Sequence, residues 1–395
     1  MARLYINSYV RRWAQRAPLV DRGLRRLETS TVAALWAVTR MLRVERASAI
    51  GALFGGTIGP RLRKHRHVLG NLSIAFPEKD RAWIEATGKE VWRQIGRTLA
   101  EYPHIDLFHA HLDRASAGTP GMPGAAAPAA EGGAPGAPGP ARSSVIAEAR
   151  VGAHAGHRGD SRVGPHGSPH GHPHARGAIT SRGTPRMALE AAFDLELLRN
   201  AERGFVLLAM HQGNWNLPGL CGALGGFPFD VIYGEQKHPD FEAMIAAHRN
   251  RMPCGFIHVD DTPRAMIQAL KGGRSVGLFV DQRVDAGDPV PFFGHDAPTV
   301  TIPARIACRL GTGVIPTGIA RLPGARFRLT MAEPIYADPA AGDAHRASIG
   351  MMARVHRQFE AWIRAQPADW CCVKRRWPKG TVPARSGADR SGAAS

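Results

Sequence analysis

The sequence predicts an α/β protein whose central sheet is mostly parallel and flanked by helices. Between residues 187 and 379, short uncharged runs with β-branched residues alternate with amphipathic segments of helical period. This alternation favours a parallel sheet, because a parallel connection usually passes through a helix packed on the sheet. With 395 residues, 44% of them hydrophobic, the chain can hold one large or two ordinary domains.

The expected strands are short apolar runs, and the expected helices carry apolar residues at helical spacing. Strands are predicted at residues 205–210, 229–233, 275–280, 313–320 and 327–331. Helices are predicted at residues 189–199, 241–251, 263–270, 302–310 and 349–365. Residues 187–379 are therefore expected to form the α/β core, followed by a polar, disordered tail over residues 380–395.

Residues 1–115 are expected to form a helical, basic part of the same domain, with helices around residues 32–42 and 81–102. Residues 1–66 contain 14 Lys and Arg against three acids, so most of the net charge of +18 lies there. Such a segment favours an anionic membrane surface or nucleic acid. No zinc-finger spacing or RNA-binding aromatic motif accompanies it, and we expect no nucleic-acid partner.

An amphipathic pattern at the start of the chain favours the membrane. Ile6, Tyr9, Val10 and Trp13 fall at positions i, i+3, i+4 and i+7 of one helical face, which is typical of an interfacial helix. An ordinary helix packed on its own domain would show the same pattern. No uncharged stretch reaches the roughly 20 residues of a membrane span, and no secretion signal is evident. The five cysteines show no metal-ligand spacing and fit the reduced thiols of a cytosolic protein. We therefore expect a peripheral protein on the cytosolic face of the membrane, or a soluble protein.

Residues 116–186 differ sharply in composition from the rest. Ala, Gly, Pro and His dominate, and Phe, Trp and Tyr are absent. Such a stretch buries too little apolar surface to offset its ordering entropy, so it is predicted to be a disordered insert. Its histidines raise the hypothesis of a weak metal site, but compositional drift in a linker explains them more simply. They are His154, His157, His166, His170, His172 and His174.

His211 is the leading catalytic candidate, because it follows the buried run 205–210 and begins a glycine-containing turn, residues 211–216. Ligands bind outside the carboxyl ends of parallel strands, and an imidazole there can take a proton from a hydroxyl nucleophile. Alternatively, a histidine at a strand end only satisfies a backbone carbonyl. Two other strand ends, at residues 233–237 and 281–283, are expected to converge on the same edge.

The sequence excludes several other chemistries. It contains no phosphate-binding P-loop, no dinucleotide fingerprint and no Gly-x-Ser-x-Gly elbow. No metal-ligand cluster occurs outside the insert, so the site is expected to need neither a metal nor a cofactor. Asp281 precedes a loop and an apolar Pro291–Phe292–Phe293 segment, although an aspartate there is often only a turn acceptor. The remaining possibility is a metal-free acid–base transfer.

These motifs together resemble the late acyltransferases of lipid A biosynthesis, which belong to the wider lysophospholipid acyltransferase superfamily. The family hallmark, His-x-Gly-Asn-Trp followed by a carboxylate, is similar to the turn that His211 begins. The resemblance covers nearly everything except the insert and the tail. It continues at residues 71–77, 97–102, 280–282, 290–294, 301–305, 369–370 and 375–377.

The resemblance implies an acyltransferase fold and the transfer of a fatty acyl chain from acyl carrier protein, or acyl-CoA, to a hydroxyl of a lipid A precursor or related glycolipid. The reaction would take place at the inner membrane, on its cytoplasmic face, with His211 as the general base. The residues implied to bind substrate are Gly213, Asn214, Trp215, Asp281, Gln282, Phe292, Phe293 and Arg305, with the two phenylalanines near the acyl chain.

Asn216 is the main departure from the family pattern, which places there a carboxylate that orients the histidine. In a serine-protease triad the comparable Asp→Asn change lowers the rate by about 10⁴. One hypothesis is that another carboxylate substitutes, with Glu235 or Asp281 nearest by strand-end position. The alternative is a catalytically impaired pseudoenzyme that binds lipid or acyl carrier protein without turnover.

Overall fold

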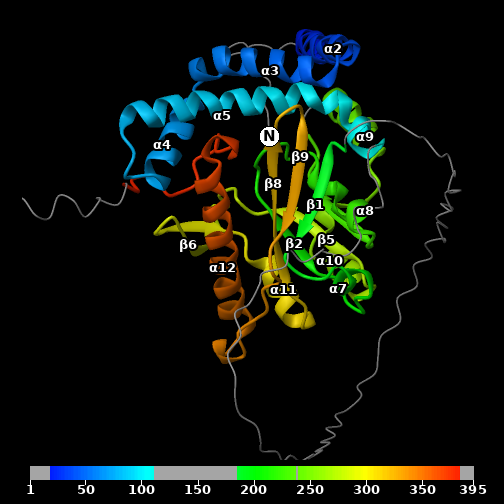
Figure 1. Ribbon diagram of the computed structural model, residues 1–395, viewed down its shortest axis with the longest axis vertical. Coiled ribbons are helices and arrows are strands. Elements are labelled where there is room, and N and C mark those ends of the chain that lie inside the picture. The colour runs from blue at the N-terminus through cyan, green and yellow to red at the C-terminus, as the bar shows by residue number, and fades with distance from the viewer. Residues whose placement is uncertain (1–17, 111–184, 237–238, 383–395) are drawn as a thin grey trace, which may run out of the picture. The chain divides into compact units, whose positions relative to one another are not determined.

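The computed structural model describes residues 18–110, 185–236 and 239–382, and these fall within one compact unit (Figure 1). The predicted interfacial helix near Trp13, nearly all of the predicted insert and most of the predicted tail lie outside the described residues. None of the helices within those described ranges is long and apolar enough to cross a membrane.

A seven-stranded sheet forms the centre of the fold, in the order β1-β9-β8-β2-β5-β3-β4 (Figure 1). Every neighbouring pair is parallel except β8 and β9, which confirms the prediction of a mostly parallel α/β sheet. The strands are β1 (Met187–Ala191), β2 (Val206–Ala209), β3 (Phe229–Tyr233), β4 (Gly255–His258), β5 (Ser275–Phe279), β8 (Val314–Leu322) and β9 (Arg326–Met331).

Strand β2 is central and buried on both faces, as its uninterrupted apolar sequence requires. Successive side chains of a strand point to opposite faces, so Val206, Leu208 and Met210 enter one hydrophobic cluster and Phe205 and Leu207 enter another. Helices contribute further members to each cluster, together with the neighbouring strands. The chain therefore needs helices on both faces, and it has them.

The N-terminal helices are α2 (Pro18–Met41), α3 (Val44–Ile58), α4 (His65–Ala75), α5 (Arg81–Glu101) and α6 (Ile105–Ala110). The later helices are α7 (Glu196–Arg199), α8 (Cys221–Gly225), α9 (Pro239–Arg249), α10 (Arg264–Lys271), α11 (Ile302–Leu310) and α12 (Ala344–Ala365). Asp80 caps α5 by accepting a hydrogen bond of 2.7 Å from the Trp83 N–H.

Helices α3 and α5 pack with their backbones in contact, because glycines face each other there. A Cβ added to Gly51 on α3 would lie 2.3 Å from the carbonyl oxygen of Gly96 on α5. A side chain at either position would therefore force the helices apart. This close contact fixes α5, whose last turn carries Thr98 and Glu101 toward the sheet.

Three parts of the fold differ from the prediction. The predicted helix at residues 189–199 is wrong: its first three residues belong to β1, which pairs with β9, and only the short α7 is helical. The expected loop after Asp281 contains a β-hairpin of β6 (Asp288–Phe292) and β7 (His295–Thr299). The prolines of this hairpin oppose the prediction of a strand, because proline has no backbone N–H to donate. Both strands of a two-stranded ribbon are edge strands, where proline is tolerated. Strand β4 was not predicted either.

Candidate active site

His211 and Asp281 are brought together by the register of the sheet. In the parallel pair β2–β5, Ala209 lies opposite Phe279, and each strand runs on for two residues to reach His211 and Asp281. The two side chains therefore leave neighbouring strand ends at the same level. His211 Nδ1 lies 2.7 Å from Asp281 Oδ1, and the side chains are only 7% and 2% exposed.

The surroundings of Asp281 favour its ionised form. Burial would raise the pKa of the carboxyl group, but the charge of His211 and hydrogen bonds from its ring and backbone N–H outweigh burial and hold the pKa below its usual value. Trp370 Nε1 also donates to Asp281 Oδ2, at 3.4 Å. A carboxylate that accepts from Nδ1–H fixes the imidazole tautomer and leaves Nε2 as the basic nitrogen.

Gln282 and Lys374 lie beside the basic nitrogen. Lys374 Nζ donates to Gln282 Oε1 at 2.6 Å, and since an ammonium only donates, the amide NH₂ of Gln282 must face the imidazole. That nitrogen is 3.3 Å from Nε2 and 3.5 Å from Nδ1 of His211. Since Nδ1 gives its proton to Asp281, only Nε2 can accept from the Gln282 amide, and a substrate hydroxyl must take the place of this amide at the basic nitrogen.

The turn after His211 is built around Gly213, whose φ of +53° favours glycine. A Cβ there would lie 2.7 Å from the carbonyl oxygen of Ile319 on β8. The Gly213 N–H donates to the Asp369 carbonyl at 3.0 Å, and its own carbonyl accepts from Thr98 Oγ1 at 2.9 Å. Helix α5 and the segment after α12 therefore hold this turn from both sides.

A buried ion pair lies beneath the turn. Glu101 on α5 is fully buried and pairs with both terminal nitrogens of Arg321 on β8. Glu101 also accepts from Asn214 Nδ2 at 3.0 Å and from Ser48 Oγ at 2.7 Å. Buried charges need such complete pairing, because an unpaired one is strongly destabilising. The pair therefore locks Asn214, three residues from His211, onto the N-terminal helices.

Asn216 does not contact the imidazole. Its side-chain amide and its backbone N–H both donate to Asn214 Oδ1, at 3.1 and 3.2 Å. The side chain therefore closes the turn locally, and the carboxylate on His211 comes from Asp281 on the neighbouring strand end. Glu235 is exposed in the segment after β3, so the structure brings Asp281 and not Glu235 to the imidazole.

The sequence of this α/β part was compared with known families. Residues 184–379 match the profile of the bacterial lipid A biosynthesis acyltransferases. The chain belongs to this family. It is thus an acyltransferase, and the matched region contains both members of the histidine–carboxylate pair. Among curated proteins, no significant match was found.

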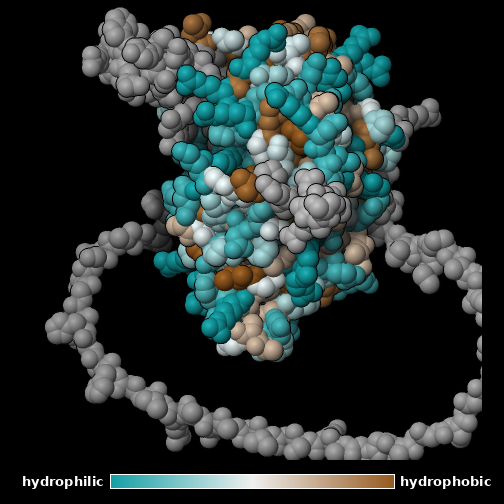
Figure 2. All heavy atoms as spheres, turned by 90° about the vertical axis from the view of Figure 1, so that its left-hand side faces the viewer, coloured by the Kyte–Doolittle hydropathy of each residue, from teal (hydrophilic) through white to brown (hydrophobic). Residues whose placement is uncertain are grey.

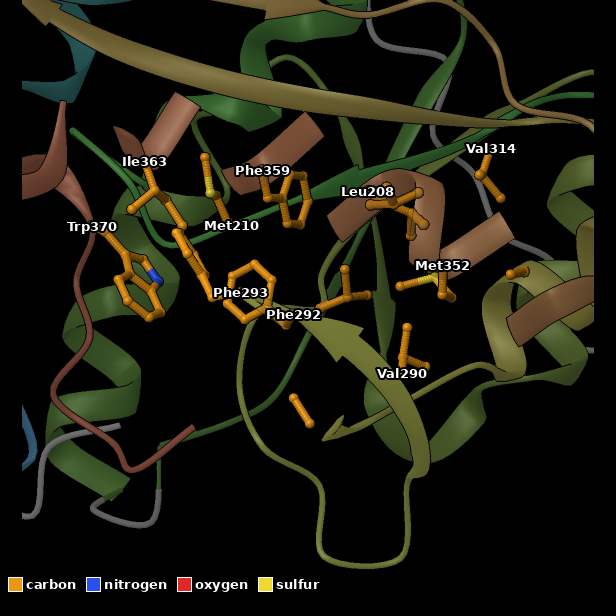
Figure 3. Close-up of a cluster of buried hydrophobic side chains, with 14 of the residues drawn as sticks. Leu208, Met210, Val290, Phe292, Phe293, Val314, Met352, Phe359, Ile363 and Trp370 are labelled. Carbon is orange, nitrogen blue, oxygen red and sulfur yellow. The ribbon is translucent and has the colours of Figure 1, made fainter. Parts of the chain in front are cut away.

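The acyltransferase's Asp281 contacts an aromatic cluster through Trp370, and Figure 3 shows Trp370 near Phe292 and Phe293 in this cluster. Phe293 stacks on Trp370 with ring centroids 6.4 Å apart, and Phe292 stacks on Trp377 at 5.7 Å. Phe292 and Phe293 are only 1% and 7% exposed. The two phenylalanines therefore belong to the core, and they reach the site through Trp370, whose indole N–H contacts Asp281.

The chain after α12 crosses the site and is tied down on both sides. The Cys371 N–H donates to the His211 carbonyl at 2.7 Å. Asn71 on α4 donates to the carbonyls of Cys372 and Lys374 at 2.8 and 2.7 Å, and its Oδ1 accepts from the Arg376 N–H at 3.0 Å. One buried asparagine thus satisfies three backbone groups of this segment.

Arg305 lies elsewhere in the acyltransferase. It projects from α11, with one guanidinium nitrogen 2.5 Å from His345 Nδ1 and 3.6 Å from Asp288 Oδ2. These contacts belong to the β6–β7 hairpin and the start of α12, and not to the His211 pair. Trp215 is closer to the site: its ring centroid is 6.3 Å from that of His211. Within the described residues, no cluster of His, Cys, Asp and Glu is arranged to hold a metal ion.

The sequence did not assign roles to five residues that hold the site: Glu101, Arg321, Trp370, Cys371 and Lys374. Glu101 and Trp370 lie in segments that carried the family resemblance, and this was the available signal for them. The rest contact the site through long-range packing, with sequence separations of up to 220 residues. Residue spacing alone contains no information about such contacts.

Proposed function

We propose that this acyltransferase moves a fatty acyl chain from a thioester, carried by acyl carrier protein or coenzyme A, to a hydroxyl of a lipid A precursor or a related glycolipid. His211 acts as the general base. The observation that carries the proposal is the buried 2.7 Å contact between His211 Nδ1 and Asp281 Oδ1, which makes Nε2 the unprotonated nitrogen that can take a proton.

The steps balance without a metal or redox cofactor. The acceptor oxygen forms a bond to the thioester carbonyl carbon as His211 Nε2 takes the hydroxyl proton. Asp281 stabilises the imidazolium that forms, because it is held ionised next to the ring. The carbon–sulfur bond then breaks, and the proton passes from the imidazolium to the departing thiolate. The products are an ester and a free thiol.

The alternative of a catalytically impaired protein rested on Asn216. The position of Asp281 supports an active enzyme instead, because the carboxylate that the motif lacks is supplied from a neighbouring strand end. An acyltransferase with this arrangement needs no contribution from Glu235, which is exposed. The pseudoenzyme hypothesis predicts binding without turnover, and the experiment below separates the two.

The surface of the N-terminal helices supports action at a membrane. On α3, Ile50, Leu53, Phe54 and Ile58 lie on one helical face and are 40–64% exposed. Figure 2 shows hydrophobic side chains gathered at the end of the protein that α2 and α3 form. We propose that this face rests on the cytoplasmic leaflet of the inner membrane, with neighbouring arginines meeting lipid phosphates.

The test is acyl transfer by the purified full chain, with radiolabelled acyl carrier protein or acyl-CoA and lipid A precursor in detergent micelles. Wild type should form labelled lipid, and His211→Ala should lower the rate by at least about 10³ with donor binding retained. Donor binding by wild type without labelled product would instead support the pseudoenzyme. Mass spectrometry of the product would identify the acyl chain and the acylated hydroxyl.

A further inference from the structure

A cleft of about 450 Å³ is lined by Asp369, whose carbonyl accepts from the Gly213 N–H, and its lining includes neither His211 nor Asp281. Its walls come from α3 and α5, the turn between β8 and β9, and the segment 366–369 after α12. Figure 1 shows the β8–β9 hairpin reaching up to α5 at this place. Ligand sites commonly have volumes of about 300–1,000 Å³, so the cleft is large enough for a head group.

Four of the side chains that line this cleft each contain a buried polar atom with no hydrogen-bond partner among the described residues. These atoms are Gln94 Oε1, Arg97 Nε, Arg321 Nε and Gln366 Oε1. Buried polar groups in native proteins are nearly always satisfied, so orphaned ones require an explanation. Four such side chains around one cleft, contributed by three separate parts of the chain, indicate a site that takes up water or a polar ligand.

The lining predicts the chemistry of that ligand. Arg97 and Arg321 place two guanidinium groups on the same cleft, and guanidinium favours phosphate. Both terminal nitrogens of Arg321 are engaged by Glu101, which leaves Arg97 as the main contact for an anion. Gln94, Gln366 and Asp369 provide carboxamide and carboxyl groups, which pair with hydroxyls. The lining thus suits a group with both a phosphate and hydroxyls.

The position of the cleft links it to the reaction. Asp369 lines it, and only Trp370 separates Asp369 from Cys371, whose N–H bonds to the His211 carbonyl. Two residues of extended chain span at most about 7 Å, so a ligand in the cleft lies close to the imidazole turn. Ser48 of the lining is on α3, where it is buried and donates to Glu101, whereas Ile50 and Leu53 of the same helix are exposed.

We propose that this cleft binds the phosphorylated, hydroxyl-bearing sugar head group of the lipid acceptor, with Arg97 as the phosphate contact. The inference rests on the proposed function and adds a site for the acceptor that is separate from the histidine–carboxylate pair. It also assigns a task to Arg97, which takes no part in proton transfer.

The test measures binding directly, by isothermal titration calorimetry of the full chain with glucosamine 1-phosphate. Arg97→Gln should weaken binding by about 10- to 100-fold, because it removes a charge-assisted contact to phosphate. Arg93→Gln is the matched control: it makes the same charge change one helical turn earlier, on an exposed side chain that does not line the cleft. It should change the affinity by less than about twofold.

Two further probes define the ligand. Glucosamine without phosphate should bind at least about tenfold more weakly than the sugar phosphate, and inorganic phosphate should also bind more weakly, because it lacks the hydroxyls. Equal affinity for inorganic phosphate would overturn the head-group assignment in favour of a free-phosphate site. An Arg97→Gln protein that binds as tightly as wild type, or a wild type that binds no sugar phosphate, would overturn the proposal altogether.

A kinetic measurement separates this proposal from the proposed function. With lipid acceptor in micelles, Arg97→Gln should raise KM for the acceptor more than it lowers kcat, because the contact serves binding and not the transfer step. Failure of acyl transfer in wild type, with sugar-phosphate binding intact and dependent on Arg97, would refute the acyltransferase proposal alone. A fall in kcat with unchanged KM would contradict the role of Arg97 in binding.

Discussion

Replacing Asp281 with asparagine tests the central pair, because the new side chain keeps the shape and loses the charge. Two charged groups in a 2.7 Å contact have their centres about 4 Å apart. At an effective dielectric constant of about 20, unit charges at this distance attract each other by about 4 kcal/mol. That energy stabilises the imidazolium as it forms. It corresponds to about 10³ in rate, and loss of the correct tautomer brings the expected decrease in kcat to about 10³–10⁴.

The assay is single-turnover acyl transfer with saturating thioester and acceptor, so that binding effects are excluded. Two variants serve as controls. Asn216→Asp should change kcat by less than about threefold, because this side chain contacts Asn214 and not the imidazole; Glu235→Gln should behave the same way, because Glu235 is exposed. Thermal unfolding checks that Asp281→Asn is still folded. The reasoning is refuted if folded Asp281→Asn keeps a tenth of the wild-type rate, or if Asn216→Asp raises it a hundredfold.

Two further predictions concern stability. Glu101→Gln should lower the free energy of unfolding by about 3–5 kcal/mol in urea titrations, because it leaves Arg321 buried without a counter-charge; a loss below about 1 kcal/mol would contradict the pairing. Burial, with the charge of Arg376, lowers the pKa of His356 to about 3 in the folded protein. The contribution of neutral His356 to the free energy of unfolding is therefore complete above about pH 6.5, the pKa of an unfolded histidine, and is lost as the pH falls toward 3. Between pH 6.5 and 5 the wild type should lose about 2 kcal/mol that His356→Gln does not lose; parallel pH profiles would rule this out.

The α/β class and most sheet elements were predictable from the sequence, because buried strands and amphipathic helices have distinct periodicities. Strand β3 and helix α11 have the predicted bounds, and α5 differs by one residue. Residues 189–191 were predicted wrongly because their pattern fits a helix or an edge strand, and pairing with β9 decides between the two. The β6–β7 hairpin was missed because its prolines oppose strand formation locally.

The candidate site was predictable in part. His211 stands out because a strand ends just before it, and Asp281 because the next strand in the sheet ends at the same level. That these two strands are neighbours is a property of the topology, so the sequence alone left Glu235 and Asp281 as equal candidates. The contacts of Glu101 and Trp370 depend on packing between segments far apart in the chain, and residue spacing does not encode them.

The segment that crosses the site, residues 369–377, follows every strand of the sheet in the sequence. Domains tend to fold as they emerge during synthesis, N-terminal parts first, so the sheet and the His211–Asp281 edge are complete in sequence before this segment is made. Until it docks, Asp281 lacks the Trp370 N–H, Gln282 lacks the ammonium that orients its amide, and the His211 carbonyl lacks a partner. A ribosome-bound or truncated chain that ends before residue 369 would therefore present a strand-end histidine without a finished site. On the proposed mechanism, acyl transfer would therefore require residues 369–377 to have docked.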